Sequence, residues 1–170
     1  MATNTLRKYS DSFKHGTKSE KAFANAARKE NFIVRKATRD QDMKEHIDFF
    51  LEQDHFQFSV DVKARKKASR YDNTFDDVWQ WIEFKNIWGN PGWLYGNADY
   101  IAFEREKDFV LANREELKNF CEEKVDQDDR VYSSREAKYK CYQRKGNKDL
   151  ITRIRMVDIN NLGENMILEK

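Results

Sequence analysis

The fold is decided by residues 46–63, which read HIDFFLEQDHFQFSVDVK. Two runs rich in apolar, strand-forming residues flank a short polar turn at 52–55, so this stretch predicts a pair of adjacent strands. In a strand, residues i and i+2 point to the same face, so we expect Asp61 and Lys63 to project together. Asp48 lies on the neighbouring strand, where its carboxylate can join them.

Two acids and a lysine that meet at a sheet edge indicate metal-assisted hydrolysis of a phosphodiester. Carboxylates supply the hard oxygen ligands that Mg²⁺ prefers, and a cation steadies or deprotonates the attacking water. The ordinary alternative for Asp61 and Lys63 is a solvated strand face with a weak ion pair. Asp48 argues against it, because it has apolar neighbours on both sides and a buried acid is costly unless paired or metal-bound.

Composition describes a folded chain with a polar surface. Of 170 residues, 36% are charged and 14% are aromatic, which excludes a disordered chain. The net charge is only +2, but basic residues cluster at 63–70 and 135–155, while acids gather in a helix-like stretch at 104–129. Segregated charges of this kind can present a positive face to phosphates.

The cellular location is predicted from cysteines and hydropathy. Cys121 and Cys141 lack metal-ligand spacing, and the composition favours free thiols over a disulfide. The N-terminus has no apolar signal core, and no run approaches the roughly 20 residues of a membrane span. We therefore expect a cytoplasmic protein without membrane contact.

The rest of the pattern predicts one domain at 16–170 behind a flexible N-terminus at 1–15. A capping-box signature at 17–20 opens a helix through Glu30. The elements expected after it are a strand at 32–34, a loop at 35–45, the two strands of 46–63, a basic loop through 77, a strand at 78–84, a glycine-rich loop at 89–96, a strand at 99–103, a helix at 114–124 and a hairpin of 138–144 with 149–157. This order indicates an α+β or mixed α/β domain with one central sheet flanked by helices.

Glu20 has two interpretations, which are compatible. As residue N3 of the capping box it stabilises the helix by about 0.5–1 kcal/mol. It also shares the inward stripe of the helix with Phe23 and Ala27, from which its carboxylate can reach a metal.

A helix-borne glutamate, a strand ending in arginine, a lone aspartate and an acid-x-lysine follow one another within residues 16–67. They are, after Gly16, the residues Glu20, Arg35, Asp48 and Asp61-Val62-Lys63. This series resembles the PD-(D/E)XK nuclease superfamily, and within it the archaeal-type Holliday-junction resolvases. The later segment 81–103 looks like that of small bacteriophage proteins in the same superfamily, for which the compartment would be the host cytoplasm.

The resemblance implies a restriction-endonuclease-like αβββαβ core and a DNA endonuclease that depends on Mg²⁺ or Mn²⁺. It implies that Asp48, Asp61 and the Val62 carbonyl ligate the metal. Glu20 would hold the metal or its water, and Lys63 would orient and help deprotonate that water. The chain departs from the family pattern where an aspartate replaces the usual glutamate of the acid-x-lysine, and where His-Ile replaces the proline before the first aspartate.

A second acid-x-lysine competes with the first. Glu83-Phe84-Lys85 lies on a predicted strand, and Asp61 would serve as its preceding aspartate. We prefer the first assignment, because a hairpin-like gap separates Asp48 from Asp61, whereas a long basic loop precedes Glu83. Glu83 remains a candidate polar neighbour of the site.

Basic residues beside the motif are expected to hold the nucleic-acid backbone by phosphate contacts, which are salt-sensitive and weakly sequence-selective. They are Arg35, Arg65, Lys66, Lys67 and Arg70. Trp88 and Trp93, set among glycines, are candidates for stacking on a base, while the other aromatic residues are assigned to the core. The glycines of this loop lack the ending of a Walker motif, and no organic cofactor is expected.

Several substrates and two other classes of protein remain as alternatives. The substrate alternatives are junction, flap, nick, linear duplex, single strand and RNA, and junction cleavage would require a homodimer to place two symmetric cuts. One other class is a nuclease-fold protein that binds nucleic acid or a partner without cutting. The second is an unrelated small α+β interaction protein, in which the acids are ordinary surface groups.

Overall fold

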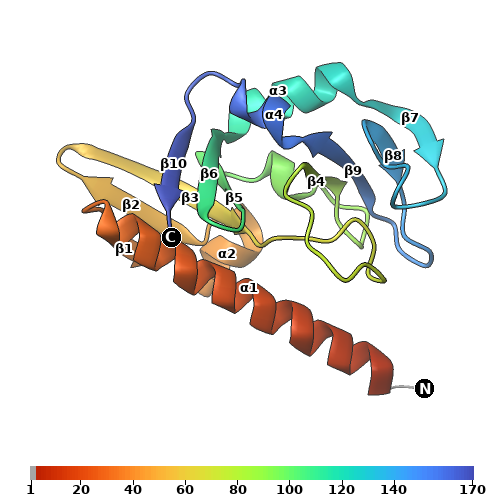
Figure 1. Cartoon of the computed structure of the whole chain (residues 1–170), viewed down its shortest axis with the longest axis horizontal. Coiled ribbons are helices and arrows are strands. Elements are labelled where there is room, and N and C mark those ends of the chain that lie inside the picture. Colours follow the sequence, from red (N-terminus) through yellow and green to blue (C-terminus); the bar gives the residue numbers. More distant parts are fainter. Residues whose placement is uncertain (1–2) are drawn as a thin grey trace.

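The computed structural model describes the backbone of residues 3–170 and the side chains of residues 13–170. Helices and strands alternate along this part of the chain (Figure 1). The helices are α1 (Thr3–Lys29), α2 (Arg39–Glu45), α3 (Arg114–Lys124) and α4 (Met156–Asn160), with a 3₁₀ turn η1 (Trp93–Tyr95). The strands are β1 (Ile33–Lys36), β2 (Phe49–Gln53), β3 (Phe56–Lys63), β4 (Trp79–Lys85), β5 (Tyr100–Glu104), β6 (Asp108–Asn113), β7 (Asp126–Val131), β8 (Lys140–Tyr142), β9 (Leu150–Arg155) and β10 (Met166–Glu169). The predicted mixed α and β class is confirmed.

The larger sheet has the strand order β1-β2-β3-β5-β6-β10. The first three strands form an antiparallel meander, as predicted for residues 46–63, and β5 runs parallel to β3. β6 and β10 complete the sheet in antiparallel orientation. The connection from β3 to the parallel strand β5 contains β4 and η1, at the place where an αβββαβ core has a helix.

A second sheet, with the order β4-β9-β8-β7, corrects the expectation of a single central sheet. The hairpin predicted near the C-terminus belongs to it, since β8 pairs with β9 in antiparallel orientation. In Figure 1 this sheet lies beside the larger one, to its right. Residues 64–78 and 86–99 connect the two sheets, and they bring β4 close to the end of β3.

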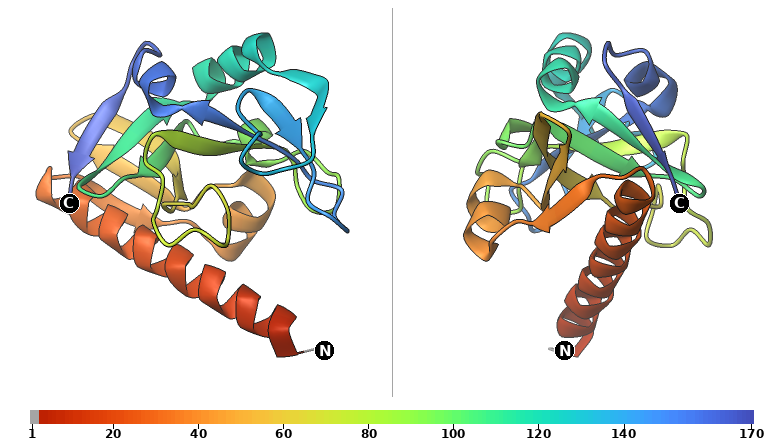
Figure 2. Two further views of the ribbon diagram at one scale, coloured as in Figure 1. Left: turned by 45° about the vertical axis from the view of Figure 1, so that its right-hand side comes forward. Right: turned by 90° about the vertical axis from the view of Figure 1, so that its left-hand side faces the viewer.

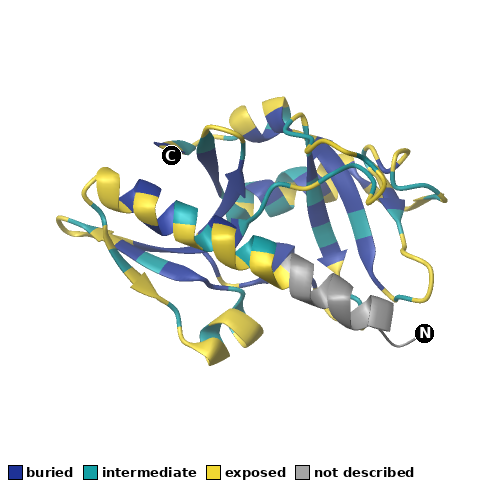
Figure 3. Ribbon diagram, turned by 60° about the horizontal axis from the view of Figure 1, so that its bottom comes forward, coloured by how far each residue is buried: buried dark blue, intermediate teal, exposed yellow. Residues whose placement is uncertain are grey.

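Two apolar cores hold these layers together. α1 buries Phe23 and Ala27 against one face of the larger sheet, where the Phe23 ring meets Phe109 edge-on with centroids 5.3 Å apart. The other core joins that sheet to β4, β9 and α3, and it contains the buried free thiols of Cys121 and Cys141. Figure 2 shows α1 on one side of the molecule with α3 and α4 on the other, and buried and exposed residues alternate along α1 in Figure 3.

Several element predictions are corrected. Residues 3–15 form the first half of α1, whereas a flexible segment was expected at 1–15, so the capping-box signature at 17–20 lies inside a helix. The expected loop at 35–45 contains α2, capped by Thr38. The helix-like stretch at 104–129 includes β6 and part of β7 besides α3. No helix among residues 3–170 is long and apolar enough to cross a membrane.

Candidate active site between β3 and β4

Asp48 and Asp61 lie opposite each other on neighbouring strands. Asp48 immediately precedes β2, and the register that pairs Phe49 with Val60 sets Asp48 against Asp61 one step further on. The backbone of Asp48 is also bound to β3, but irregularly, since Asp48 N–H donates at 2.9 Å to the carbonyl of Val60, which is the register partner of Phe49. The Asp48 carboxylate turns back over β3, where its Oδ2 accepts a hydrogen bond of 2.7 Å from Val62 N–H.

Lys63 lies two residues beyond Asp61 on the same face of β3, as the strand spacing predicts. Its Nζ is 2.7 Å from Asp61 Oδ1. The ammonium also lies over the ring of Trp93, 4.8 Å from the ring centroid, which is a favourable cation–π arrangement. Trp93 is buried, so it supports Lys63 and does not offer a face for a base.

Burial makes the two carboxylates easier to protonate than free carboxylates. Asp48 and Asp61 are 9% and 4% exposed. Burial, followed by the negative charge of Asp61, raises the pKa of Asp48 to about 7. Burial also raises the pKa of Asp61, an effect that Lys63 opposes. Two adjacent acids with raised pKa values are more typical of functional sites than of structural ones.

The carboxylate oxygens of Asp48 and Asp61 provide some, but not all, of the ligands that a hard divalent cation requires. Asp61 Oδ2 is buried and has no hydrogen-bond partner among residues 13–170. A proton on Asp48 or a cation between the two acids would satisfy that oxygen, and carboxylate oxygens suit Mg²⁺ or Mn²⁺. The same residues contain no group of three or more His, Cys, Asp or Glu side chains arranged to hold a metal ion. The protein therefore supplies two adjacent carboxylates, with any further oxygen ligands coming from the backbone or water.

Glu20 is the predicted site residue that the structure sets apart. Its carboxylate forms a salt bridge with Lys36 of β1. It remains close enough to contribute, as the weakest of the causes, to the raised pKa of Asp48. The prediction of four side chains at one point therefore holds for Asp48, Asp61 and Lys63, with Glu20 at the edge.

Two further titratable side chains lie near the site, one at the end of α2 and one on β4. His46, which ends α2 in a left-handed conformation (φ 55°), has a lowered pKa because it is buried, with the charges of Asp61 and Lys63 acting in opposite directions. Burial raises the pKa of Glu83 on β4, and Lys63 opposes that rise. The sequence singled out Glu83, but it did not predict that Lys63 would be the cation with the largest effect on the pKa of Glu83.

The competing assignment for the acid-x-lysine is not favoured by these positions. The register of β4 shifts between Glu83 and Lys85, and Lys85 is exposed. Within residues 13–170 Lys85 forms no salt bridge, and the cation nearest in influence to Glu83 is Lys63. Glu83 is thus a polar neighbour of the Asp61–Lys63 pair.

Four of the five residues expected to contact phosphates interact with other side chains of the protein. Arg65 is held by Asp77 through two hydrogen bonds, of 2.8 and 3.0 Å. Arg35 lies over Phe50, two strands away from β3 in the sheet order. Arg70 donates to the hydroxyl of its neighbour Tyr71, and Lys67 lies near the Phe75 ring. Each of these four side chains already has a partner within the protein.

Lys66 is the exception in this basic group, because within residues 13–170 its side chain has no salt bridge, hydrogen bond or aromatic ring as a partner. Its pKa is lowered, first by desolvation of its ammonium and then by the positive charges of Lys63 and Arg144. Arg144 comes from the turn between β8 and β9, far away in sequence. The late basic cluster was visible in the sequence, but only the fold brings Arg144 close to Lys66.

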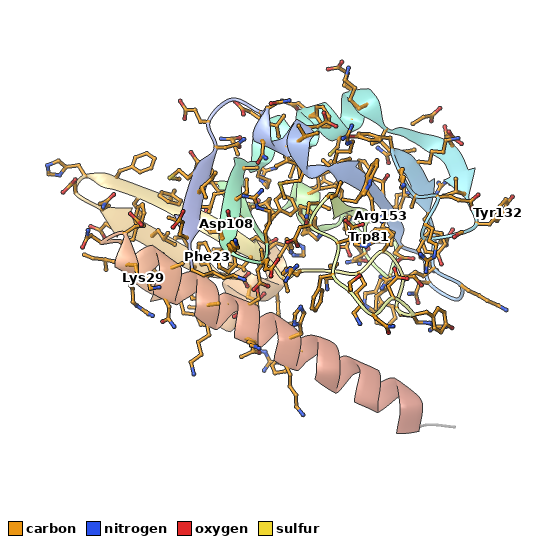
Figure 4. All side chains as sticks on the ribbon, in the orientation of Figure 1. Phe23, Lys29, Trp81, Asp108, Tyr132 and Arg153 are labelled. Carbon is orange, nitrogen blue, oxygen red and sulfur yellow. The ribbon has the colours of Figure 1, made fainter. Side chains whose placement is uncertain are left out.

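Other aromatic residues serve the structure around the site. Trp79 and Trp81 flank the buried guanidinium of Arg153 on β9, at 5.9 and 5.4 Å from their ring centroids. Arg153 also binds Asp76 in the basic loop that follows β3. Figure 4 shows Arg153 and Trp81 together in the body of the second sheet. This cluster fixes the loop that carries Lys66.

Comparison of the chain with family models, with curated proteins and with solved structures finds no match. The function is therefore argued from the arrangement of Asp48, Asp61, Lys63 and their neighbours.

Proposed function

We propose that this chain is a divalent-metal-dependent endonuclease that hydrolyses phosphodiester bonds in DNA. The observation that carries the proposal is the buried pair Asp48–Asp61 with Lys63 at hydrogen-bonding distance from Asp61. A purely structural site would not be expected to set two acids opposite each other in a strand pair, because like charges there destabilise the sheet. The resemblance to the PD-(D/E)XK superfamily supports the same reaction.

Oxygen atoms of Asp48 and Asp61, with the carbonyl of Val62 as the resemblance implies, would hold Mg²⁺ or Mn²⁺. The partnerless Oδ2 of Asp61 supports this choice. A bound divalent ion lowers the pKa of water and screens the charge of the phosphate. Glu20 would assist from the edge of the site once its carboxylate is free of Lys36.

Lys63 would act on the water and the phosphate. Asp61 and the Trp93 ring hold its ammonium in place, so the ammonium is oriented before a substrate arrives. In this position it can donate a hydrogen bond to the attacking water or to a phosphate oxygen as negative charge develops. His46 and Glu83 would contribute to the electrostatic environment of Lys63 and the two acids.

The test is a cleavage assay with branched DNA, linear DNA and RNA in Mg²⁺, Mn²⁺ or EDTA. The protein should cut DNA only with a metal, and Asp48→Asn and Lys63→Met should each reduce the rate by at least about a hundredfold. Asp40→Asn is the matched control, since Asp40 is an exposed acid with a lysine partner, Lys44. Equal cleavage by the parent and both site variants would refute the assignment.

A second candidate function is binding of nucleic acid without cleavage. The pairing of Glu20 with Lys36 favours it, because it leaves only two acids at the centre of the site. A protein of this kind would bind DNA equally well in EDTA and would cut none of the substrates with any metal. The same assay therefore separates the two functions. In either case we propose a cytoplasmic location.

A further inference from the structure

Trp88 is an exposed aromatic residue on a fixed turn between β4 and η1. It is 74% exposed, more than any other tryptophan of the chain. The Asn86 side-chain oxygen accepts hydrogen bonds from the backbone N–H groups of Trp88 (3.0 Å) and Asn90 (3.1 Å). Gly89 closes the turn with a φ of 85°, which glycine adopts without strain. The turn thus presents a large ring to the solvent from a well-defined backbone.

A cationic loop lies against this turn. Residues 143–149 join β8 to β9, and Lys148 N–H donates to the Ile87 carbonyl at 3.0 Å. A Cβ on Gly89 would lie only 3.3 Å from Lys148 Cβ, so the two turns are in contact. Three exposed cations of the loop are Arg144, Lys145 and Lys148. Within residues 13–170 only Arg144 has an acidic partner, the buried Asp149, so net positive charge lies beside Trp88.

Trp88 also lies close in sequence to two residues of the candidate active site. Glu83 precedes it on β4 and interacts with Lys63, and Trp93 follows it and lies under the same ammonium. Five residues separate Trp88 from each, and an extended chain spans at most about 3.6 Å per residue, so the backbone of Trp88 is within about 18 Å of both. At a rise of about 3.4 Å per nucleotide, this is roughly five nucleotides along a strand.

We propose that Trp88 stacks on an unpaired nucleobase while Arg144, Lys145 and Lys148 contact the neighbouring phosphates. An aromatic ring stacks on any base, and cations neutralise phosphates without reading sequence. The bases of an intact duplex stack on each other and offer no free face within the helix. The preferred substrate therefore has an unpaired segment within about five nucleotides of the scissile bond. The distance from the unpaired segment to the scissile bond rests on the proposed function, whereas the stacking of Trp88 on an unpaired base does not.

The experiment measures affinity by fluorescence anisotropy in EDTA at fixed salt. The probes are a labelled single strand of about 20 nucleotides and the matching blunt duplex. Trp88→Ala should weaken single-strand binding by about 5- to 150-fold and duplex binding by less than about twofold, while Trp88→Phe should retain most of the single-strand affinity. Phe56→Ala is the control, because Phe56 is an exposed aromatic residue (57%) at the far end of the larger sheet, beside the β2–β3 turn.

Three results would overturn the inference. They are no single-strand binding by the parent, unchanged single-strand binding by Trp88→Ala, and an equal loss on the duplex. The double variant Lys145→Ala/Lys148→Ala tests the phosphate contacts, since each lost contact should reduce the slope of log affinity against log salt by about 0.7. An unchanged slope would refute those contacts.

The outcome is independent of catalysis, because no divalent metal is free in EDTA. A protein that binds single strands through Trp88 but never cuts DNA would refute only the proposed function. A protein that cuts DNA with no contribution from Trp88 to strand binding would refute only this inference.

Discussion

Asp48 and Asp61 face each other across β2 and β3, and Val62 N–H donates to the Asp48 carboxylate. Opposed like charges weaken a strand pair, and burial increases the penalty. Lys63 forms an ion pair with Asp61, whereas the charge of Asp48 is opposed by burial and by Asp61 and is favoured only by the Val62 N–H bond and the more distant charge of Lys63. We therefore expect the ionised form of Asp48 to weaken the fold of the metal-free protein, and this gives the first prediction.

Asp48→Asn should stabilise the metal-free protein while abolishing cleavage. The amide oxygen can keep the bond from Val62 N–H, and the new NH₂ can donate to the partnerless Asp61 Oδ2. We expect a gain on the order of 1–3 kcal/mol in the free energy of unfolding at pH 8, measured by urea denaturation in EDTA. Asp40→Asn, at an exposed ion pair, should change it by less than about 0.5 kcal/mol.

The gain should depend on pH in a defined direction. Since folding raises the pKa of Asp48 from 3.8 to about 7, the folded state binds more protons between these values and loses stability as the pH rises. The advantage of Asp48→Asn should therefore shrink as the pH falls from 7 and vanish below about pH 4. An advantage that is equal at pH 4 and pH 8 would contradict this account.

Lys63→Met should destabilise the protein, in contrast to Asp48→Asn. Removal of the ammonium leaves Asp61 and Glu83 without their cation. Because Asp61 is buried, we expect a loss of about 2–4 kcal/mol in the free energy of unfolding at pH 7. Addition of Asp61→Asn should recover part of the loss, which a double-mutant cycle measures. Strict additivity of the two substitutions would show that the pair is not coupled.

Gly92→Ala should disrupt the approach of η1 to β4. A Cβ at this position would lie 2.4 Å from the Glu83 carbonyl oxygen, and backbone atoms cannot move aside easily. We expect a loss of about 1–3 kcal/mol by thermal or urea unfolding. Gly16→Ala is the opposite control, because nothing lies within 4 Å of its Cβ and it is inside α1. Alanine there should stabilise the protein by up to about 1 kcal/mol.

Lys66 and Arg65 should respond differently to truncation, although they are adjacent. Lys66→Ala removes an exposed cation, so it should lower DNA affinity in EDTA and reduce the salt slope by about 0.9 for a duplex, with little effect on stability. Arg65→Ala leaves Asp77 without its main partner and should instead lower the unfolding free energy, by about 1–3 kcal/mol. Equal effects of both variants on affinity would argue that Arg65 leaves Asp77 to bind phosphate.

Local patterns were sufficient for the centre of the site. The two apolar runs of 46–63 and the polar turn between them predict the β2–β3 pair, and strand periodicity predicts the contact of Asp61 with Lys63. Both depend on residues close in sequence, whose geometry the strand itself sets. The same holds for α3 and for the β8–β9 hairpin.

The parts that were missed depend on contacts distant in sequence. Glu83 lies near Lys63 because the second sheet, which contains β4, packs beside the larger sheet, and no local sequence pattern predicts that packing. Glu20 fits an inward helical stripe, but the position of Lys36 on β1 determines where its carboxylate points. The helix at 3–15 was not predicted, because most of its residues are polar.

One ammonium group serves both sheets of this protein. Lys63 projects from β3 of the first sheet, while Glu83 and the Trp93 ring come from β4 and the turn that follows it. A negatively charged substrate that bound Lys63 would weaken the interactions of its ammonium with Glu83 and Trp93. One polar contact between the two sheets would then be weaker. If the proposed reaction takes place, catalysis and this one polar contact between the sheets would therefore depend on the same side chain, while the apolar core keeps the sheets together.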